Sequence, residues 1–163
     1  MLPVHTDPPR LVPARMINGL LYCERLMVLE WAQGEFADNE FTVGGRAVHR
    51  RADRPGGTLP APPGDDGPAP AAPPERPYQA RSVWLSSERL RLTAKIDVVE
   101  SEAGKVLPIE YKRGKRPYVP EGAYLPERAQ LAVHLLLLRK HGYVCDEAAI
   151  YFAGDNGPRP HPG

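Results

Sequence analysis

The chain has 163 residues, enough for one domain with a sizeable core and too few for two full domains. Its 21 lysines and arginines nearly balance 20 aspartates and glutamates, so a net charge of +1 does not by itself indicate a nucleic-acid binder, although clustered charge can still steer DNA. No apolar run approaches the roughly 18 residues of a membrane span, the N-terminus lacks an export signal, and two cysteines fit a reducing cytosol better than a disulfide framework. We therefore expect a single cytoplasmic domain over residues 1–163.

The first predicted element is one helix within residues 13–33. Its apolar residues recur at three- and four-residue steps, which gives a broad apolar stripe formed by Met16, Leu20, Cys23 and Met27. The two cysteines of the chain, Cys23 and Cys145, lie in no CxxC pair, and each is interpreted from its residue type as a small buried hydrophobe.

A second helix is expected over residues 39–53, although each residue of the Gly44–Gly45 pair costs roughly 1 kcal/mol relative to alanine in a helix interior. His49 lies in this segment. A histidine there is commonly a surface or capping residue, but a neutral imidazole is also a good third ligand for a divalent metal such as manganese.

The composition changes sharply between Arg54 and Pro77, which contain nine of the 20 prolines and almost no large apolar residue. Such a segment cannot bury enough surface to offset its chain entropy. We expect an extended or mobile insertion over residues 54–80. The part before it is too short to fold alone, so both sides must share one core.

After the insertion the apolar period changes to two, which predicts strands within residues 81–87, 90–100 and 106–112. Residues 126–142 then predict a helix, with Pro126 in the first turn and Gly142 at the end. Residues 146–154 predict a last strand, and residues 154–163 resemble a linker. This order favours an α/β fold in which helices flank a mixed central sheet.

The turn Ala103–Gly104 fixes the register of the predicted hairpin, because a two-residue loop sets Glu102 opposite Lys105. Facing residue numbers then sum to 207. One face becomes apolar and the other charged, and a slip by one residue would mix them. The apolar pairs are Ile96 with Tyr111 and Val98 with Ile109, and the charged pairs are Asp97 with Glu110 and Lys95 with Lys112.

Two opposed carboxylates, Asp97 and Glu110, should repel each other at a separation of about 5 Å between Cβ atoms. A divalent cation would remove that conflict and could polarise a phosphate oxygen, while Lys112 would stabilise phosphoryl charge or orient the attacking water. The alternative is an ordinary solvated sheet face. The pattern alone leaves both open.

The segment after the hairpin is basic and aromatic, which suits phosphate contact and base stacking, although an ordinary solvated turn has the same composition. Its candidate DNA-binding residues are Arg113, Lys115, Arg116 and Tyr118. On the following helix, Gln130 and His134 lie one turn apart. They form either a polar stripe or a face directed at DNA or a metal-bound water.

The series His49, Asp97, Glu110-Tyr111-Lys112 and Gln130 resembles the motifs of RecB-like nucleases in the PD-(D/E)xK superfamily. Within it, the chain is most similar to the CRISPR-associated RecB-like exonucleases, the "Cas four" family, which also carry a cysteine closely followed by arginine on an early helix. The resemblance covers about residues 11–153, and the combination of motifs is more specific than any one of them.

The resemblance implies a metal-dependent DNA nuclease. His49, Asp97, Glu110 and the backbone carbonyl of Tyr111 would bind Mn²⁺ or Mg²⁺, Lys112 would be the catalytic lysine, and Gln130 would support the site. Such proteins process prespacer DNA with single-stranded overhangs and help recognise the PAM during CRISPR adaptation. Their partners are the CRISPR integrase and its small partner subunit, and fusion to the integrase would explain a linker-like tail. The alternative is a non-catalytic DNA-recognition subunit that gates an integrase.

The chain departs from the family pattern at two points. The family's QxxxY motif has His134 in place of tyrosine, for which we expect altered contact with DNA. Family members also hold a [4Fe–4S] cluster with an early cysteine, matched by Cys23, and three later ones, which this chain lacks although four thiolates are the usual requirement. We expect the missing cysteines beyond Gly163, in a chain truncated before a cysteine-rich segment. The other reading is a member without a cluster.

Overall fold

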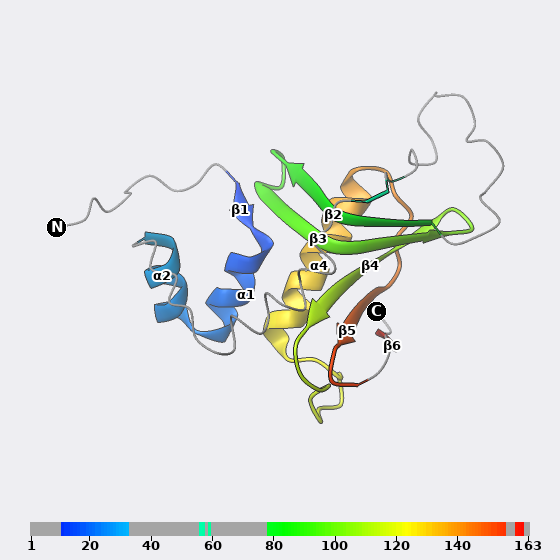
Figure 1. Ribbon diagram of the computed structural model, residues 1–163. Coiled ribbons are helices and arrows are strands. Elements are labelled where there is room, and N and C mark those ends of the chain that lie inside the picture. Colours follow the sequence, from blue (N-terminus) through cyan, green and yellow to red (C-terminus); the bar gives the residue numbers. More distant parts are fainter. Residues whose placement is uncertain (1–10, 33–55, 58, 60–77, 156–158, 162–163) are drawn as a thin grey trace.

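The structure is a computed structural model that describes residues 11–32, 56–57, 59, 78–155 and 159–161. It is an α/β fold with one mixed sheet whose strand order is β1-β3-β4-β5-β6, and β2 pairs with β3 off this path (Figure 1). The strands are β1 (Val12–Pro13), β2 (Tyr78–Ser87), β3 (Leu92–Glu102), β4 (Lys105–Lys112), β5 (Ala148–Phe152) and β6 (Arg159–His161), and the helices are α1 (Ala14–Tyr22), α2 (Glu24–Ala32) and α4 (Leu125–Lys140). Among these helices, none has the length and apolar character needed to cross a membrane.

The β3–β4 hairpin turns as predicted. Ala103 and Gly104 both have positive φ, 50° and 80°, as the two central residues of a type I′ turn require. The register runs from Glu102↔Lys105 to Val98↔Ile109, so the paired numbers sum to 207. The turn therefore fixes the alignment of the two strands.

The predicted pairing extends too far, however, because the strands separate beyond Val98 and Ile109 (Figure 1). From Ile109 to Lys112, β4 pairs in parallel with β5, while the start of β3 at Leu92 pairs in parallel with β1. The ladder therefore does not include the three predicted pairs at this end, 97 with 110, 96 with 111 and 95 with 112. The sheet forks at Asp97.

The side-chain alternation of β3 also breaks at the fork. Ile96 and Val99 both belong to the cluster that contains Leu138 of α4, whereas Val98 packs with Ile109 and, from its edge, Tyr111. The expected apolar face that joins Ile96 to Val98 is therefore wrong. Across the sheet, residues 81 and 83 of β2 pair with β3 on either side of this point, and Ser82 between them has a positive φ of 54°. Both strands lose their regular pleat at the same place.

Helix α4 forms as the sequence predicts, with proline in its first turn and Arg139 and Lys140 in its last turn. Gly142 follows it with a φ of 86°. The helix connects the parallel strands β4 and β5 and packs on the sheet through Val133, Leu137 and Leu138. It covers the face of the sheet on which Ile96 and Val99 lie.

The single N-terminal helix of the sequence analysis is two helices. Cys23 is extended, with φ of −163° and ψ of 109°, yet its N–H donates to the carbonyl of Gly19 and its carbonyl accepts from Met27. A Cβ atom at Gly19 would lie 3.8 Å from the Cβ of Met27, an ordinary van der Waals distance, so α2 packs against α1 there. The apolar stripe is correspondingly divided: Met16 is buried, whereas Leu20 and Cys23 are exposed. The interpretation of Cys23 as a buried hydrophobe is therefore wrong.

Two predicted loop boundaries are also corrected. Residues 78–80, placed in the insertion, begin β2, where Ala80 is buried. Residues 159–161, placed in the linker-like tail, form β6 and pair antiparallel with β5. The helix predicted over residues 39–53, with His49, lies outside the described residues.

Candidate active site at the fork between β3 and β4

Asp97 lies at the point of the fork and is only 5% exposed. Its Oδ2 accepts a 2.8 Å hydrogen bond from the backbone N–H of Tyr111 on the diverging strand. A side-chain carboxylate therefore bridges β3 and β4 where the backbone ladder has ended. The fold thus places a buried negative charge at the opening.

Glu110 is the second buried carboxylate, also 5% exposed. Its Oε1 accepts a 2.8 Å hydrogen bond from Nε2 of Gln130 and lies 3.4 Å from Nζ of Lys112. The lysine side chain is 25% exposed, so its amine lies at the boundary between the buried cluster and solvent. Such an arrangement holds the lysine beside the carboxylate while leaving it accessible.

Gln130 connects three elements of the fold. Its Oε1 accepts a 3.0 Å hydrogen bond from Nδ2 of Asn18 on α1 and lies 3.5 Å from Nζ of Lys112. Asn18 was not among the predicted site residues. Its signal in the sequence is weak: a lone amide within the apolar run of α1, whose partner is 112 positions away.

His134 lies one helical turn after Gln130 and is fully buried. Neither of its ring nitrogens has a hydrogen-bond partner among the residues that the structure describes. Burial lowers the pKa of His134 from 6.5 to about 4, the negative charge of Asp97 opposes this change, and the positive charge of Lys112 adds to it. The ring is therefore neutral at physiological pH and lies within electrostatic reach of both groups.

Asp97 and Glu110 both act on residues of α4. The first acts electrostatically on His134 and the second is bonded to Gln130, and both partners belong to α4. The structure brings together five of the predicted site residues: Asp97, Glu110, Lys112, Gln130 and His134.

Tyr111 contributes its backbone to the fork and its ring to the opposite packing cluster. The ring lies 4.8 Å from that of Tyr151, between centroids, and burial raises its pKa. Its carbonyl as a metal ligand stays a prediction.

The two carboxylates have the chemistry of a divalent-metal site, and the nitrogens of His134 are buried polar atoms that lack a partner in the described part of the chain. Within the described ranges, no three His, Cys, Asp or Glu side chains come close enough to form a complete cage. His49, the predicted third ligand, lies outside them. Metal binding by Asp97 and Glu110 therefore stays a prediction, and it would need further ligands.

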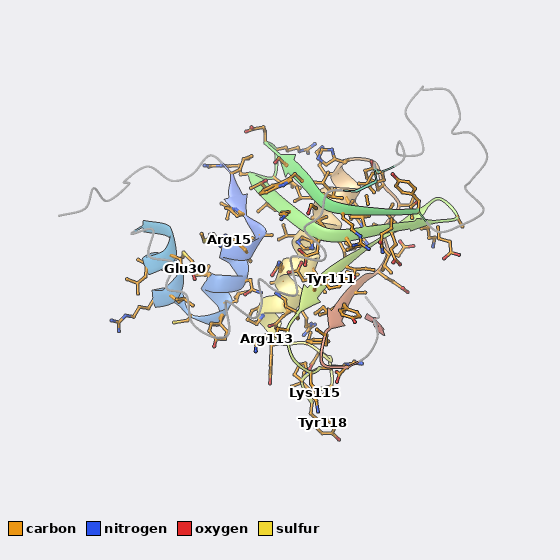
Figure 2. All side chains as sticks on the ribbon, viewed as in Figure 1. Arg15, Glu30, Tyr111, Arg113, Lys115 and Tyr118 are labelled. Carbon is orange, nitrogen blue, oxygen red and sulfur yellow. The ribbon has the colours of Figure 1, made fainter. Side chains whose placement is uncertain are left out.

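The predicted DNA-binding residues lie on the loop between β4 and α4, where Arg113, Lys115 and Tyr118 leave the sheet below the fork (Figure 2). The side chain of Tyr118 is fully exposed. The loop is anchored by a 2.7 Å hydrogen bond from the backbone N–H of Arg116 to Asp155, and by another from Gly154 to the carbonyl of Gly114. It continues directly from Lys112 and is held in place by these two bonds.

The cysteines do not form a cluster site. Cys23 is exposed between α1 and α2, whereas Cys145 is buried, donates from Sγ to the carbonyl of Glu147, and has its pKa raised by burial to about 11. The chain contains no other cysteine. Four thiolates are needed for a [4Fe–4S] cluster, so residues 1–163 do not fit this cofactor by themselves.

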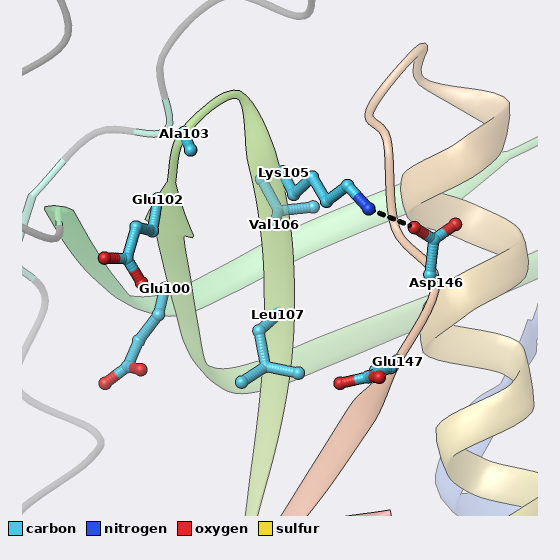
Figure 3. Close-up of a pocket in the computed structure, with 8 residues that line it drawn as sticks. All are labelled: Glu100, Glu102, Ala103, Lys105, Val106, Leu107, Asp146 and Glu147. Atoms are coloured by element: carbon cyan, nitrogen blue, oxygen red, sulfur yellow. Dashed lines mark hydrogen bonds and ion pairs between the residues drawn. The ribbon is translucent and has the colours of Figure 1, made fainter. Parts of the chain in front are cut away.

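A separate pocket lies at the turn end of the β3–β4 hairpin, away from the fork (Figure 3). Acidic side chains line it, among them Glu100 and Glu147, and Lys105 forms a 2.8 Å ion pair there with Asp146. Both partners of that pair are exposed, so it contributes little to stability. None of the predicted site residues lines this pocket.

Comparison with known proteins finds similarity to nucleases. The profile of the PD-(D/E)XK nuclease superfamily matches residues 21–161. A CRISPR-associated exonuclease Cas4/endonuclease Cas1 fusion from Geobacter sulfurreducens is 54% identical over 142 residues, which are 87% of this chain and 24% of the relative. A CRISPR-associated exonuclease Cas4 from Rhodospirillum rubrum is 44% identical over 157 residues, 93% of this chain and 44% of the relative. The chain therefore spans less than half the length of these curated relatives.

Proposed function

This chain belongs to the PD-(D/E)XK nuclease superfamily, and from that membership we propose that it is a divalent-metal-dependent DNA nuclease acting in CRISPR adaptation. Its substrate would be prespacer DNA with single-stranded ends, which it would trim, and it would help recognise the PAM. The observation that carries the proposal is a pair of buried carboxylates at the fork: Glu110 lies 3.4 Å from the amine of Lys112, and Asp97 is bonded to the backbone of Tyr111 between these two residues.

The proposed roles follow from the contacts at the fork. Asp97 and Glu110 would hold Mn²⁺ or Mg²⁺, with His49 and the carbonyl of Tyr111 as further ligands. When bound, the metal would polarise the scissile phosphate and lower the pKa of a bound water. Lys112 would stabilise negative charge on the phosphate, and Gln130 would fix the orientation of Glu110 through its 2.8 Å hydrogen bond.

The loop after β4 would position the strand. Its basic residues Arg113, Lys115 and Arg116 would contact phosphates, and the exposed ring of Tyr118 would stack on a base. The relatives named as Cas4/Cas1 fusions support Cas1, the CRISPR integrase, as the partner, either fused or separate. The small partner subunit would join that complex. We expect the protein to act on this DNA in the cytoplasm. A [4Fe–4S] cluster at Cys23 would need three thiolates from outside residues 1–163.

The test compares wild type with Asp97→Asn and Lys112→Ala on a DNA duplex with single-stranded overhangs, with Mn²⁺ or Mg²⁺ supplied. Both variants should lose cleavage by at least about 10²-fold, because each removes a charge that acts on the transition state. Their affinity for the same DNA in EDTA should stay close to that of wild type. Wild-type protein that binds this DNA but does not cleave it with either metal would favour the alternative, a DNA-recognition subunit that gates an integrase.

A further inference from the structure

We infer that Asn18 on α1 is a positioning residue for the reaction. It holds the amide of Gln130 in the orientation that keeps Glu110 beside the amine of Lys112. Helix α1 would thereby help to set the geometry on which cleavage depends. The inference rests on the proposed function, and it gives a role to a residue outside the predicted site.

The contact between Asn18 and Gln130 is supported by apolar packing of α1 on α4. Ala14 of α1 is buried with Val133 and Leu137 of α4 in one core cluster. Asn18 follows Ala14 by four residues and Gln130 precedes Val133 by three, which are spacings at which side chains share one face of a helix. The two amides therefore extend from backbones that the core holds in place.

The side chain of Gln130 is held at both ends of its amide. Its Oε1 accepts a 3.0 Å hydrogen bond from Nδ2 of Asn18, and its Nε2 donates a 2.8 Å hydrogen bond to Oε1 of Glu110. Nζ of Lys112 lies 3.5 Å from the amide oxygen, at the outer limit of a hydrogen bond. Asn18 is therefore the closer anchor of that oxygen.

The orientation of the Gln130 amide matters because its two ends are chemically opposite. The amide oxygen accepts hydrogen bonds and the amide nitrogen donates them. If the amide turned over, its oxygen would face the carboxylate of Glu110 and its nitrogen would face the ammonium group of Lys112, so both contacts would become repulsive. Lys112 lies 3.4 Å from the same Glu110 oxygen that Gln130 binds, so a reversed amide would disturb both charged groups together.

A purely structural role for Asn18 predicts a different result. If the contact only ties α1 to α4, its loss would lower stability and leave the turnover of the folded protein unchanged. Asn18→Asp separates the two roles, because a carboxylate has nearly the shape of the amide and offers only acceptors. Gln130 would then have to turn its nitrogen toward position 18 and its oxygen toward Glu110.

The experiment measures kcat and KM with Mn²⁺ on a DNA duplex with single-stranded overhangs, using the full chain under conditions where circular dichroism shows each variant to be folded. We expect Asn18→Asp to lower kcat about 10–100-fold at nearly unchanged KM, because small displacements of reacting groups cost up to about 10²-fold. Asn18→Leu should lower kcat less, since Glu110 and Lys112 still favour the native orientation of the amide. Leu20→Asp is the matched control. It adds the same charge to α1 at an exposed position that does not share a face with Asn18, and it should keep the wild-type kcat.

A double-mutant cycle tests whether Asn18 acts through Gln130. In a Gln130→Met background, Asn18→Asp should change kcat little further, because the amide that it would reverse is absent. An undiminished loss in that background would mean that the new charge acts directly on Lys112, and it would overturn the inference. Urea denaturation in EDTA gives a readout without cleavage: the destabilisations by Asn18→Leu and Gln130→Met should be non-additive. Additive effects would contradict the contact itself.

A wild-type kcat in Asn18→Asp, together with lost cleavage in Lys112→Ala, would overturn the role of Asn18 and leave the proposed function intact. Wild-type protein that cleaves with neither Mn²⁺ nor Mg²⁺ would overturn both. Should Asn18→Asp fail to fold, Asn18→Leu replaces it: a lowered kcat at unchanged KM would support the inference, and a kcat equal to that of wild type would overturn it.

Discussion

At the scale of single residues, the fork brings charged side chains together in a buried environment. Asp97 and Glu110 are both nearly buried, and burying a carboxylate is costly unless hydrogen bonds or opposite charge offset it. The backbone N–H of Tyr111 donates a hydrogen bond to Asp97. Glu110 accepts a hydrogen bond from Gln130 and forms an ion pair with Lys112. The groups that would bind a metal are therefore also the groups on which local stability depends.

Gln130 is the residue at which this dependence can be measured. Gln130→Ala would remove the hydrogen bond to buried Glu110 and leave Asn18 without its acceptor. We expect the free energy of unfolding, measured by urea denaturation, to fall by about 1–3 kcal/mol. Arg128→Ala, an exposed change on the same helix, should alter it much less. Equal effects of the two changes would mean that the hydrogen bonds of Gln130 contribute nothing to stability.

The buried ring of His134 should make the stability of the metal-free protein depend on pH. Its pKa is lowered on folding from 6.5 to about 4, so between these values the unfolded chain binds a proton that the folded chain does not. Stability is therefore fully present above pH 6.5 and decreases as the pH falls toward 4, with a slope of at most about 1.4 kcal/mol per pH unit from this residue.

Urea denaturation in EDTA across this range should show a smaller decrease for His134→Gln than for wild type. His141→Gln removes an exposed histidine and should keep the wild-type slope. Parallel curves for His134→Gln and wild type would show that His134 is not buried as a neutral ring.

At the scale of elements, one residue of the hairpin turn has a strained backbone, and a substitution there should relieve the strain. Ala103 has a φ of 50°, in the left-handed region that disfavours a Cβ atom. Ala103→Gly removes that atom, and Ala103→Asn places there a residue that tolerates this conformation and is favoured before glycine in such turns. We expect Ala103→Asn to raise the free energy of unfolding by about 0.5–1 kcal/mol, measured by denaturation. Ser101→Asn, a strand position nearby, is the control. No gain would indicate a different turn conformation.

The same elements show how far the sequence predicts the fold. The turn and the alternation of β3 and β4 are local signals, so the register from residue 98 to residue 109 is predictable. The fork is not, because β5 and β1 compete for the strand edges from distant positions in the chain. The hinge at Cys23 likewise has no local signal, and the partnership of Asn18 with Gln130 depends on the packing of α1 against α4.

The candidate site, like the fold, can be predicted from the sequence only in part. Charged residues at alternate positions indicated the acidic pair and the lysine, because two carboxylates that face each other on a hairpin should repel unless a cation offsets the repulsion. Sequence could not decide whether His134 belongs to a solvated stripe or faces the site, because both readings give the same helical spacing. The packing of α4 excludes the solvated stripe, because the ring is completely buried.

At the scale of the whole molecule, the net charge of +1 means that DNA binding must depend on where the positive residues lie. The proposed function places the contacts on the loop that follows β4, next to the fork. Lys105 provides the contrast, because it lies at the other end of the hairpin and is paired with Asp146. Lys105 and Lys115, a lysine of the loop after β4, carry the same charge but lie at different positions on the molecule.

Salt dependence therefore distinguishes a local DNA surface from general attraction. The affinity for single-stranded DNA should fall with salt concentration, and each lost phosphate contact should reduce the slope of log K against log salt by about 0.7. Lys115→Ala should lower both the affinity and this slope, whereas Lys105→Ala should leave both unchanged. Tyr118→Ala should weaken binding by about 1–3 kcal/mol without changing the slope, because stacking releases no counterions. Equal losses for Lys105→Ala and Lys115→Ala would mean that DNA does not follow the loop, and that the strand reaches the carboxylates of the fork by another path.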